Sequence, residues 1–310
     1  MIGWLLVAPL SVCAAARAAR LEESSSLLLL GAGLTPFLGP PALLAFGIGL
    51  WQHRRALTVV SAATAGILLF TALPGLGVPA GARPPAGGVA TLRVFSANVY
   101  DANPDVGRIA EEIEAAAPDL LALQEVNPGG AAALRRSGVL ARFRYRRAET
   151  RGGASGIGLW SRFPLAEIQV HHVGGMPLIR ATVILGGRRL RFYTVHTVAP
   201  LGVDRPRWRA QLRWIDEALR REDGPLVVAG DFNATRYHRS FRRLLSDRLV
   251  DAHERRGRGW ATTWPWGYWL PPLMRLDHVL VSPDIGVRSV REGLGHGSDH
   301  RPIIAELVPP

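Results

Sequence analysis

The chain begins with long apolar runs and changes, near residue 91, to short apolar stretches separated by polar clusters. Positions without a formal charge extend over 1–16, 24–53 and 56–82. A helix needs roughly 20 apolar residues to cross the hydrocarbon core of a bilayer. The two longer runs reach that length and the first is marginal, so we predict about three transmembrane helices within 1–73.

The second run contains its own interruptions. Thr35-Pro36 and Gly39-Pro40-Pro41 divide it into an early part and a later part. Proline interrupts a helix because it lacks an N–H and its ring clashes with the preceding turn. We therefore expect the early part to lie at the membrane interface and the span itself to cover about 37–52. The third run predicts the cleanest helix, from Leu57 to about Leu76.

The first run has a second interpretation, as a cleaved signal peptide. It carries no basic residues ahead of its apolar part, and Val12 stands where a lipoprotein signal needs a small residue before Cys13. We expect a span here, with the signal peptide as the alternative that the residues leave open.

The loops between these runs predict an orientation. Residues 52–55 include two Arg and no acid, whereas residues 17–23 balance two Arg with two Glu. Cytoplasmic loops are enriched in basic residues, so we expect 52–55 in the cytoplasm. Everything after the Pro/Gly-rich linker 74–90 then lies outside the cytoplasmic membrane, including a domain at 91–310.

Residues 91–310 have the pattern of an α/β domain. Short apolar runs predict strands, and helices are expected after Asn103 and after Pro206. The expected strands are 91–99, 119–126, 156–161, 179–185, 188–197, 225–233, 275–282 and 300–308. The pair around Gly186-Gly187 reads as an antiparallel hairpin. A mixed sandwich of sheets with helices outside therefore fits better than a strict βαβ arrangement.

Composition restricts the chemistry. All 37 basic residues are Arg, which excludes lysine Schiff bases and a P-loop lysine. The single Cys13 excludes an internal disulfide and a multi-cysteine metal site. The net charge is +12, and residues 91–310 hold +9 of it, with 32 Arg against 23 acids. That charge suits nucleic acid or anionic lipid headgroups as a partner.

Unusual polar residues stand at or beside the ends of the expected strands. Each one has an ordinary structural explanation, such as a turn cap. Their number is the signal, because strand ends bring side chains from distant parts of a chain to one rim. The residues are Asn98, Glu125, His196, Asp231, Asn233, Asp277, Asp299 and His300.

These residue types suit metal-assisted phosphoryl transfer. Mg²⁺ prefers oxygen ligands from one or two carboxylates, which fits Glu125 with Asn98 nearby. A zinc site is disfavoured, because the chain has no HExxH motif and no cysteine cluster. His300 could take a proton from water if Asp277 held its tautomer.

The remaining polar residues complete that interpretation. Asp231 and Asn233 could position the nucleophile and stabilise charge that develops on the phosphoryl oxygens, and His196 could donate a hydrogen bond to the phosphate.

Taken in order, these motifs resemble the endonuclease/exonuclease/phosphatase superfamily, which includes DNase I-like nucleases, sphingomyelinases and inositol-phosphate phosphatases. The matching segments are SANV, LQEV, GIGLWS, TVHT, GDFN, RLDHVL and SDHRP, spread over 91–308. The resemblance implies a four-layer αββα sandwich and a Mg²⁺- or Mn²⁺-dependent hydrolase of phosphoesters or phosphoanhydrides.

The resemblance also implies roles for single residues. Glu125 is the principal metal ligand, Asn98 supports the metal and the phosphate, and Asp299 is a further metal-binding or structural acid. Asp231 and Asn233 position the nucleophile and the phosphate. In the same way His196 contacts the phosphate and Asp277 orients His300. Asn98 is followed by Val-Tyr-Asp, so no metal role is assigned to Asp101.

The whole arrangement is similar to a narrower set, the VanJ-type bacterial membrane proteins linked to teicoplanin resistance. Three spans, an Arg-Arg loop, a Pro-rich linker and the stretch 259–277 carry this likeness. It implies a multi-pass protein of the bacterial cytoplasmic membrane whose active site faces the cell envelope. The implied substrate is a lipid-linked phosphate such as undecaprenyl pyrophosphate. No protein partner is indicated.

An aromatic stretch at 264–272 supports a lipid substrate independently. It holds Trp264, Trp266 and Trp269 with one Tyr among prolines. Trp and Tyr favour the membrane interface, so this loop could enter the interface or line a groove for an acyl or prenyl chain. A loop folded onto the domain core is the alternative.

Three other functions compete. One is an exported, membrane-tethered nuclease, because Arg142, Arg144, Arg146, Arg147 and Arg151 surround Phe143 and Tyr145 and could follow a phosphate backbone. Another is a phospholipid phosphodiesterase. The third, a non-catalytic envelope binding protein, is disfavoured because Glu125, Asp231, Asn233 and His300 are all present.

Overall fold

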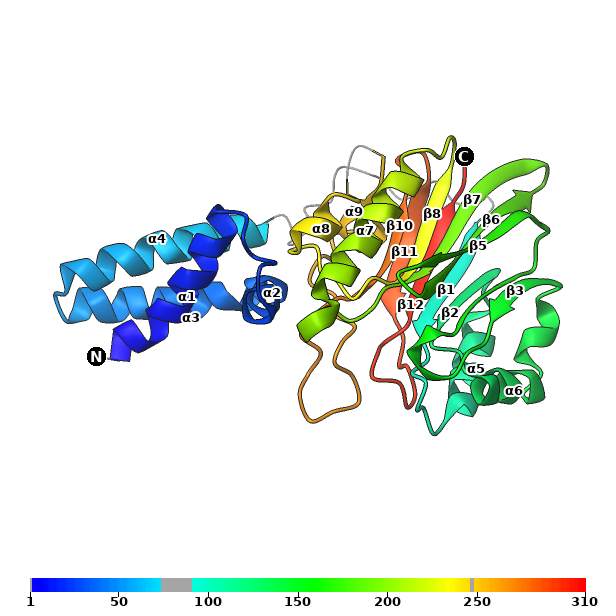
Figure 1. The fold of residues 1–310 in the computed structure, drawn as a ribbon, viewed down its shortest axis with the longest axis horizontal. Coiled ribbons are helices and arrows are strands. Elements are labelled where there is room, and N and C mark those ends of the chain that lie inside the picture. The colour runs from blue at the N-terminus through cyan, green and yellow to red at the C-terminus, as the bar shows by residue number, and fades with distance from the viewer. Residues whose placement is uncertain (1, 74–90, 246–247) are drawn as a thin grey trace.

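The computed structural model describes residues 2–73, 91–245 and 248–310, so the predicted linker at 74–90 lies outside the described residues. Figure 1 shows a helical N-terminal part beside a larger domain of sheets and helices. The N-terminal helices are α1 (Ile2–Ala18), α2 (Ser26–Gly33), α3 (Thr35–Trp51) and α4 (Arg55–Ala72).

Helices α1, α3 and α4 pack along one another through small and aliphatic side chains. Val7, Ala45 and Leu57 form one buried cluster, and Leu10, Ala42 and Leu68 belong to another. By length and composition alone, α4 is able to cross a membrane, and α2 with α3 passes the same test only as a pair bent by 88°. Helix α1 is apolar but shorter. Three spans are thus not established by these helices.

Of the two predicted interruptions in the second apolar run, only the one next to Thr35-Pro36 coincides with a bend. Helix α3 continues through Gly39, Pro40 and Pro41, so the expected break there is wrong. Both prolines lie in the first two turns, and the φ that a proline ring imposes is close to the helical value. The bend falls at Leu34, which ends α2 and precedes α3.

The larger domain contains two mixed six-stranded sheets. The first has the order β11-β12-β1-β2-β4-β3 and the second has the order β5-β6-β7-β8-β10-β9. Strands of the first are β1 (Leu92–Asn98), β2 (Leu120–Gln124), β3 (Tyr145–Glu149), β4 (Ile157–Ser161), β11 (Gly286–Glu292) and β12 (Ile303–Val308). Strands of the second are β5 (Leu165–Val173), β6 (Met176–Leu185), β7 (Arg188–His196), β8 (Leu226–Asp231), β9 (Val250–Asp251) and β10 (Asp277–Val281).

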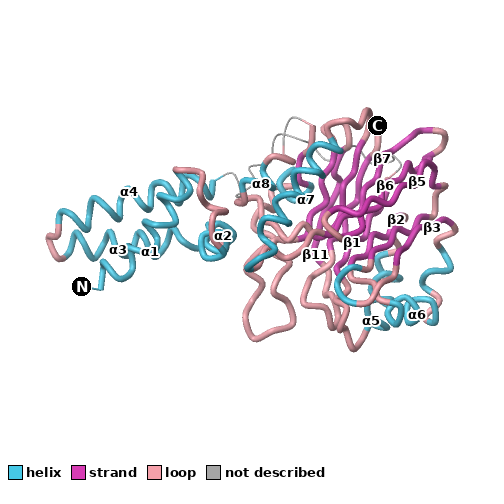
Figure 2. The backbone as a smooth tube through the Cα atoms, in the orientation of Figure 1, coloured by secondary structure: helices cyan, strands magenta, loops and turns pink. Residues whose placement is uncertain are grey.

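Helices cover the outer faces of both sheets, with α7 and α8 on one side of the strands and α5 and α6 on the other (Figure 2). They are α5 (Val106–Ala116), α6 (Pro128–Arg136), α7 (Arg205–Leu219), α8 (Arg239–Arg242) and α9 (Ala252–Arg255). Short 3-10 turns are η2 (Val139–Arg142), η3 (Gly153–Ser155) and η4 (Gly202–Asp204). The layered α/β sandwich expected from the sequence is therefore present.

Strand alternation explains how the layers form. In β1, Val94 faces the core between the sheets and Phe95 faces the helices. In β8, Ala229 faces the same inner core and Val228 packs with α7 residues. Strands covered on both faces read as continuous apolar runs, which is why their positions were predictable. Strands β3, β5, β9 and β11 have weaker apolar patterns, and their positions were not predicted from the sequence.

Candidate active site

Each sheet has a face that lines the core between the two sheets. On that face, rows of apolar side chains end in polar side chains at one edge of the sandwich. Alternate residues of a strand share a face, so Leu92 and Val94, which line the inner core, place Asn98 on the same face of β1. The same count applies to three strands of the second sheet: Phe192 leads to His196 in β7, Ala229 to Asp231 in β8, and Val279 to Asp277 in β10. The polar residues of the site therefore continue the same strand faces that carry the apolar core residues.

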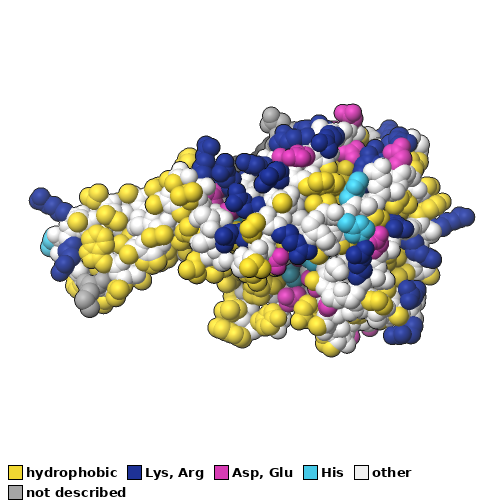
Figure 3. Space-filling view, in the orientation of Figure 1, with side chains coloured by type: hydrophobic (Ala, Val, Ile, Leu, Met, Phe, Trp, Pro, Cys, Tyr) yellow, Lys and Arg dark blue, Asp and Glu magenta, His cyan; other side chains and the backbone are white. Residues whose placement is uncertain are grey.

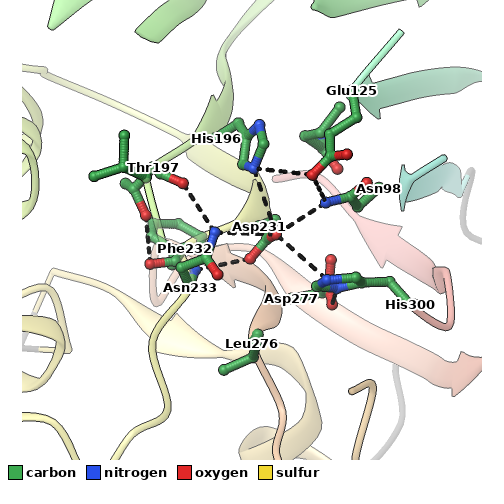
Figure 4. A network of polar contacts seen from close by, with 12 residues as sticks. Asn98, Glu125, His196, Thr197, Asp231, Phe232, Asn233, Leu276, Asp277 and His300 are labelled. Carbon is green, nitrogen blue, oxygen red and sulfur yellow. Dashed lines mark hydrogen bonds and ion pairs between the residues drawn. The ribbon is translucent and has the colours of Figure 1, made fainter. Parts of the chain in front are cut away.

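Strand register then brings these side chains together (Figure 4). Asp231 pairs with His196 on the parallel neighbour β7 and with Asp277 on the antiparallel neighbour β10. Side chains directly opposite one another in a sheet lie about 5 Å apart. Three groups that are far apart in sequence therefore stand in one row across the second sheet.

Asn98 joins the two sheets. Its Nδ2 donates to Glu125 Oε1 at 2.8 Å and to Asp231 Oδ2 at 3.1 Å. Glu125 follows β2 directly and has a φ of 58°, which turns its side chain toward Asn98. Its other oxygen accepts the backbone N–H of Asp101 at 3.1 Å.

His300 lies between two carboxylates. Its Nδ1 donates to Asp277 Oδ2 at 2.8 Å, and its Nε2 is 3.8 Å from Asp231 Oδ2. The loop that carries it is tied to β1, because Ser298 Oγ donates to the Asn98 carbonyl at 2.8 Å and accepts the His300 N–H at 3.0 Å. The predicted pairing of Asp277 with His300 is thus present in the geometry.

Burial and these neighbours set the protonation states. Burial alone would lower the pKa of His300, but Asp277 and Asp231 outweigh it and raise that pKa to about 10. Burial raises the pKa of Asp231 to about 6, against the charge of His300, and it also raises the pKa of Glu125. Burial lowers the pKa of His196. Near neutral pH, a charged His300 therefore faces buried carboxylates beside a neutral His196.

The donor set fits a hard divalent cation on the Glu125 side. Glu125 and Asp231 both accept from the Asn98 side-chain amide, so two carboxylates meet at one small group. Buried Asp277 Oδ1 has no hydrogen-bond partner. Oxygen donors of this kind are the ligands that Mg²⁺ and Mn²⁺ prefer.

A second grouping has metal-like spacing. One ligand atom each from Asp231, Asp277 and His300 lies within 4.8 Å of the others. Because His300 and Asp277 are already bonded to each other, we interpret this grouping as an imidazole held by carboxylates rather than as the ion site.

Asn233 and Thr197 shape the opposite side of the site. The Asn233 N–H donates to Asp231 Oδ1 at 2.7 Å, and its Nδ2 donates to the Thr197 carbonyl at 2.9 Å. Gly230 allows β8 to approach β7 here, because a Cβ on Gly230 would lie 2.0 Å from the Val195 carbonyl oxygen. The GDFN segment is therefore a tight turn as well as a source of functional groups.

His196 makes no ordinary hydrogen bond to either nearby carboxylate. Its Nε2 is 3.7 Å from Glu125 Oε1 and 3.6 Å from Asp231 Oδ2, beyond ordinary hydrogen-bond distance. A phosphoryl oxygen between these groups would come within reach of this nitrogen.

Asp299 lies at the rim rather than in the row of strand-end residues. Its Oδ2 accepts the Trp264 indole N–H at 3.3 Å, and its carbonyl accepts the Trp266 N–H at 2.9 Å. Its charge raises the pKa of both Glu125 and His300. Asp299 is thus near the site and connected to the aromatic loop.

Several hydroxyl groups that position the site were not singled out from the sequence. Thr263 Oγ1 accepts the N–H groups of Leu276 and Asp277 at 3.0 and 3.3 Å, and Thr197 Oγ1 donates to the Phe232 carbonyl at 2.6 Å. Ser298 has the role described above. A short hydroxyl residue next to a functional residue is the signal that could have identified Thr197 and Ser298. Thr263 is 14 positions from Asp277, so no local signal marks it.

The family model for the endonuclease/exonuclease/phosphatase family matches residues 95–300. Among solved structures, TDP2 of D. rerio complexed with single-strand DNA product is similar at 19% identity and a TM-score of 0.61, covering 70% of this chain and 99% of that one. Truncated TDP2 of Caenorhabditis elegans matches at 21% identity and a TM-score of 0.60, covering 70% and 98%.

The Bacteroides thetaiotaomicron mannosyl-6-phosphatase is similar at 18% identity and a TM-score of 0.55, covering 70% of this chain and 99% of that one. No curated protein matches the chain. At these identities the solved structures show a shared fold. The family model covers most of the chain together with the site, and it sets aside the non-catalytic alternative. This protein belongs to the endonuclease/exonuclease/phosphatase family and is a phosphoric ester hydrolase.

Proposed function

We propose that the protein is a membrane-anchored, divalent-metal-dependent phosphohydrolase whose active site faces the cell envelope. Its proposed substrate is the phosphoester or pyrophosphate of a lipid-linked molecule, of the undecaprenyl pyrophosphate type. The domains of this proposal are a transmembrane region at 1–73, a linker at 74–90 and the catalytic domain at 91–310.

The observation that carries the lipid substrate is the loop at 264–272. Trp264 and Trp266 hold its near end against Asp299 and the Leu294 carbonyl, beside the reaction centre. Trp269 is 89% exposed at its far end, with Tyr268 also exposed. Exposed aromatic side chains favour membrane interfaces and prenyl or acyl chains. The three tryptophans thus divide into two that anchor the loop and one that extends from it.

The helical part supports the membrane anchor. Large apolar side chains are exposed along it, including Trp51 and Phe70. Figure 3 shows hydrophobic side chains along the visible face of this part, with basic ones at its far end and near the domain. The α3–α4 turn, next to Arg54 and Arg55, is the end remote from the domain (Figure 1). Basic residues there favour a cytoplasmic turn.

The protonation pattern favours Asp231, rather than His300, as the group that accepts a proton. His300 is held charged by Asp277 and Asp231, so it serves better as a donor to a phosphoryl oxygen. In the proposed reaction water attacks phosphorus and its proton passes to Asp231. The bond from phosphorus to the leaving oxygen breaks as the new P–O bond forms.

His196 and Asn233 bind the phosphoryl oxygens in this reaction, and Asp277 keeps His300 in place. A divalent ion, when bound by Glu125 with Asn98 and Asp299 nearby, supplies positive charge to those oxygens. The chain's own groups orient water and phosphate around it.

The test is phosphate release by the full-length protein in detergent with Mg²⁺ or Mn²⁺. Undecaprenyl pyrophosphate, phospholipids and plasmid DNA are compared, with His300→Ala as the control. Selective, His300-dependent release from the prenyl pyrophosphate supports the proposal. Hydrolysis of phospholipid headgroups or of DNA, without hydrolysis of the prenyl pyrophosphate, would show that the protein acts on that other substrate.

A tethered nuclease is the second candidate, because the similar D. rerio TDP2 structure contains single-strand DNA. Arg144, Arg146 and Arg147 are exposed on or next to β3, an edge strand of the first sheet. Exposed arginines at an edge could follow a phosphate backbone. Cleavage of plasmid DNA in the same assay decides for this candidate.

The proposed topology has its own test. A reporter enzyme that works only outside the cytoplasm is expected to be active when it is fused after Gly88. A reporter that works only in the cytoplasm would overturn the topology.

A further inference from the structure

The segment between α1 and α3, residues 19–34, contacts the catalytic domain through buried acidic side chains. We call it the docking segment. Glu22 is 2% exposed, and its Oε1 accepts from Arg242 at 2.8 Å. Both oxygens of Glu23 accept from Ser240, from its N–H at 2.7 Å and its hydroxyl at 2.6 Å. These contacts join the docking segment to α8 of the catalytic domain, and the residues in contact are more than 200 positions apart in the sequence.

A buried histidine extends this contact. His238 Nδ1 accepts the Thr235 N–H at 2.9 Å, so its Nε2 carries the proton and donates to the Leu29 carbonyl at 3.0 Å. The Leu29 side chain is buried in the same cluster as Trp208 and Phe241. Helix α2 therefore contributes one residue to the core beneath α7 and α8.

The docking segment also contacts the base of the aromatic loop. A Cβ on Gly33 would lie 2.8 Å from Met274 Sδ, so the Met274 side chain packs directly against the Gly33 backbone. Gly33 and Phe37 line a narrow cleft together with Trp260 and Met274. Met274 pairs with Trp264 across the neck of the aromatic loop. The contact between Gly33 and Met274 therefore helps to fix the position of that loop.

The outer side of α2 suits a membrane surface. The helix is bent by 88° from α3, so it runs across the end of the apolar helices rather than along them. Leu27 is 81% exposed and Leu30 is half exposed, while Leu29 faces the domain. A short apolar helix at right angles to a span fits the interfacial plane.

We infer that the docking segment holds the catalytic domain in one orientation on the membrane, so that the reaction centre takes its substrate from the leaflet in which α2 lies. This inference rests on the proposed function. Glu22 is buried and Arg242 is partly exposed. An ion pair of this kind adds little net stability, because desolvation offsets the attraction, but it disfavours misaligned contacts in which the buried charge stays unpaired. Its role here is to select an orientation.

The same contacts assign sides of the membrane. The docking segment and the catalytic domain must lie on one side, since Glu23 and Ser240 touch. The α3–α4 turn and the start of α1 lie at the other end of the helices (Figure 1). With the domain outside, both of those ends are cytoplasmic, and α1 and α3 each cross the membrane.

A cysteine pair tests the contact without any activity assay. In full-length protein carrying Cys13→Ser, Glu23→Cys with Ser240→Cys is expected to form a disulfide in native membranes under mild oxidation, seen as a gel-mobility change that reductant reverses. Glu23→Cys with Asp105→Cys is the matched control, because Asp105 is exposed beyond the other sheet. Absence of the bond in the first pair, or equal bonding in both pairs, overturns the docking.

The positioning role is tested by a ratio of activities. Glu22→Gln is expected to lower hydrolysis of prenyl pyrophosphate in vesicles about tenfold, since small misplacements are costly for reaction. Hydrolysis of a soluble aryl phosphate should be unchanged. Glu217→Gln, at an exposed position on α7, is the control. Equal loss on both substrates, or no loss on vesicles, overturns the inference.

Rescue completes the test. Adding Glu22→Gln to the Glu23→Cys, Ser240→Cys protein should give low vesicle activity when reduced and near-normal activity when oxidised. No recovery on oxidation contradicts a positioning role. If the unaltered protein hydrolyses no lipid-linked phosphate, the proposed function fails, whereas the cysteine pair still decides whether the segment docks.

Discussion

Asp277 and Asp231 lie directly opposite each other on β10 and β8, and His300 lies between their carboxylates. One imidazole between two buried acids is held in its charged form, which raises its pKa to about 10. In the proposed reaction, that relationship favours His300 as a cation for the phosphate and Asp231 as the proton acceptor. It also makes the three residues one functional unit.

Asp277→Asn is expected to lower kcat on a soluble aryl phosphate by about 10²-fold, because an amide does not balance the His300 charge. His300→Ala should cost a similar factor. Because groups acting as a unit are not additive, the double variant should be little worse than either single one. A double variant whose loss equals the product of the two single losses would show that the residues act independently.

Glu125→Gln is expected to raise the Mg²⁺ concentration needed for half-maximal activity by roughly 10- to 100-fold. The amide keeps the shape of the side chain but loses the charge that binds the ion, and its one oxygen can accept from only one of the two donors, Asn98 Nδ2 and the Asp101 N–H. Titration of activity with Mg²⁺ and Mn²⁺ measures this, and direct metal binding by calorimetry supplies a second readout. His300→Ala should leave the metal requirement unchanged, and a shift of equal size there would argue against Glu125 as the principal ligand.

Trp269→Ala is expected to reduce hydrolysis of lipid substrate in vesicles by about tenfold while activity on a soluble analogue survives, because the exposed indole touches no reaction-centre residue. Trp264→Ala is the comparison. Its indole donates to Asp299, so both activities should fall. Equal loss on both substrates for Trp269→Ala would defeat the interfacial role of the loop.

Gly230→Ala is expected to destabilise the domain by about 2–4 kcal/mol, since the added methyl group would overlap the Val195 carbonyl and the φ of 149° disfavours a side chain. Gly152→Ala, where a Cβ meets nothing within 4 Å, should be neutral. Thermal unfolding of the two variants measures the difference. A Gly230→Ala protein as stable as the parent would mean that β7 and β8 are further apart than described.

Acidification should weaken the folded protein through His238. Burial lowers its pKa to about 4 from an ordinary 6.5, with Arg17 and Arg242 acting in the same direction and the Leu29 carbonyl and Glu23 opposing it. Between those values the unfolded chain binds the proton and the folded one does not. Stability from this group is therefore present above about pH 6.5 and is lost as the pH falls toward 4.

The measurement is the unfolding temperature in detergent at about pH 7.5 and about pH 5. His238→Gln keeps a donor for Leu29 but cannot titrate, so it should show a smaller drop between the two conditions. An identical drop in both proteins would assign the pH dependence to other groups.

Local periodicity was enough to locate the helices and strands that have strong apolar patterns, because burial on one or both faces leaves a pattern in neighbouring residues. Alternation along β1, β7 and β8 was enough to place Asn98, His196 and Asp231 at strand ends. The motif order indicated the family, and the family model confirmed it. Those inferences concern residues close together in the chain or their order along it.

The identity of neighbouring strands, and the groups that each side chain faces, became visible only in the folded domain. Asn98 and Asp231 are 133 positions apart, and no local pattern reports that one donates to the other. The charge of His300 depends on two carboxylates from different strands, and the contact between Glu23 and Ser240 depends on how the helices meet the domain. The bend at Leu34 replaced the predicted break at Gly39-Pro40-Pro41. Register, burial and charge balance are properties of the assembled chain, so they are absent from any window of its sequence.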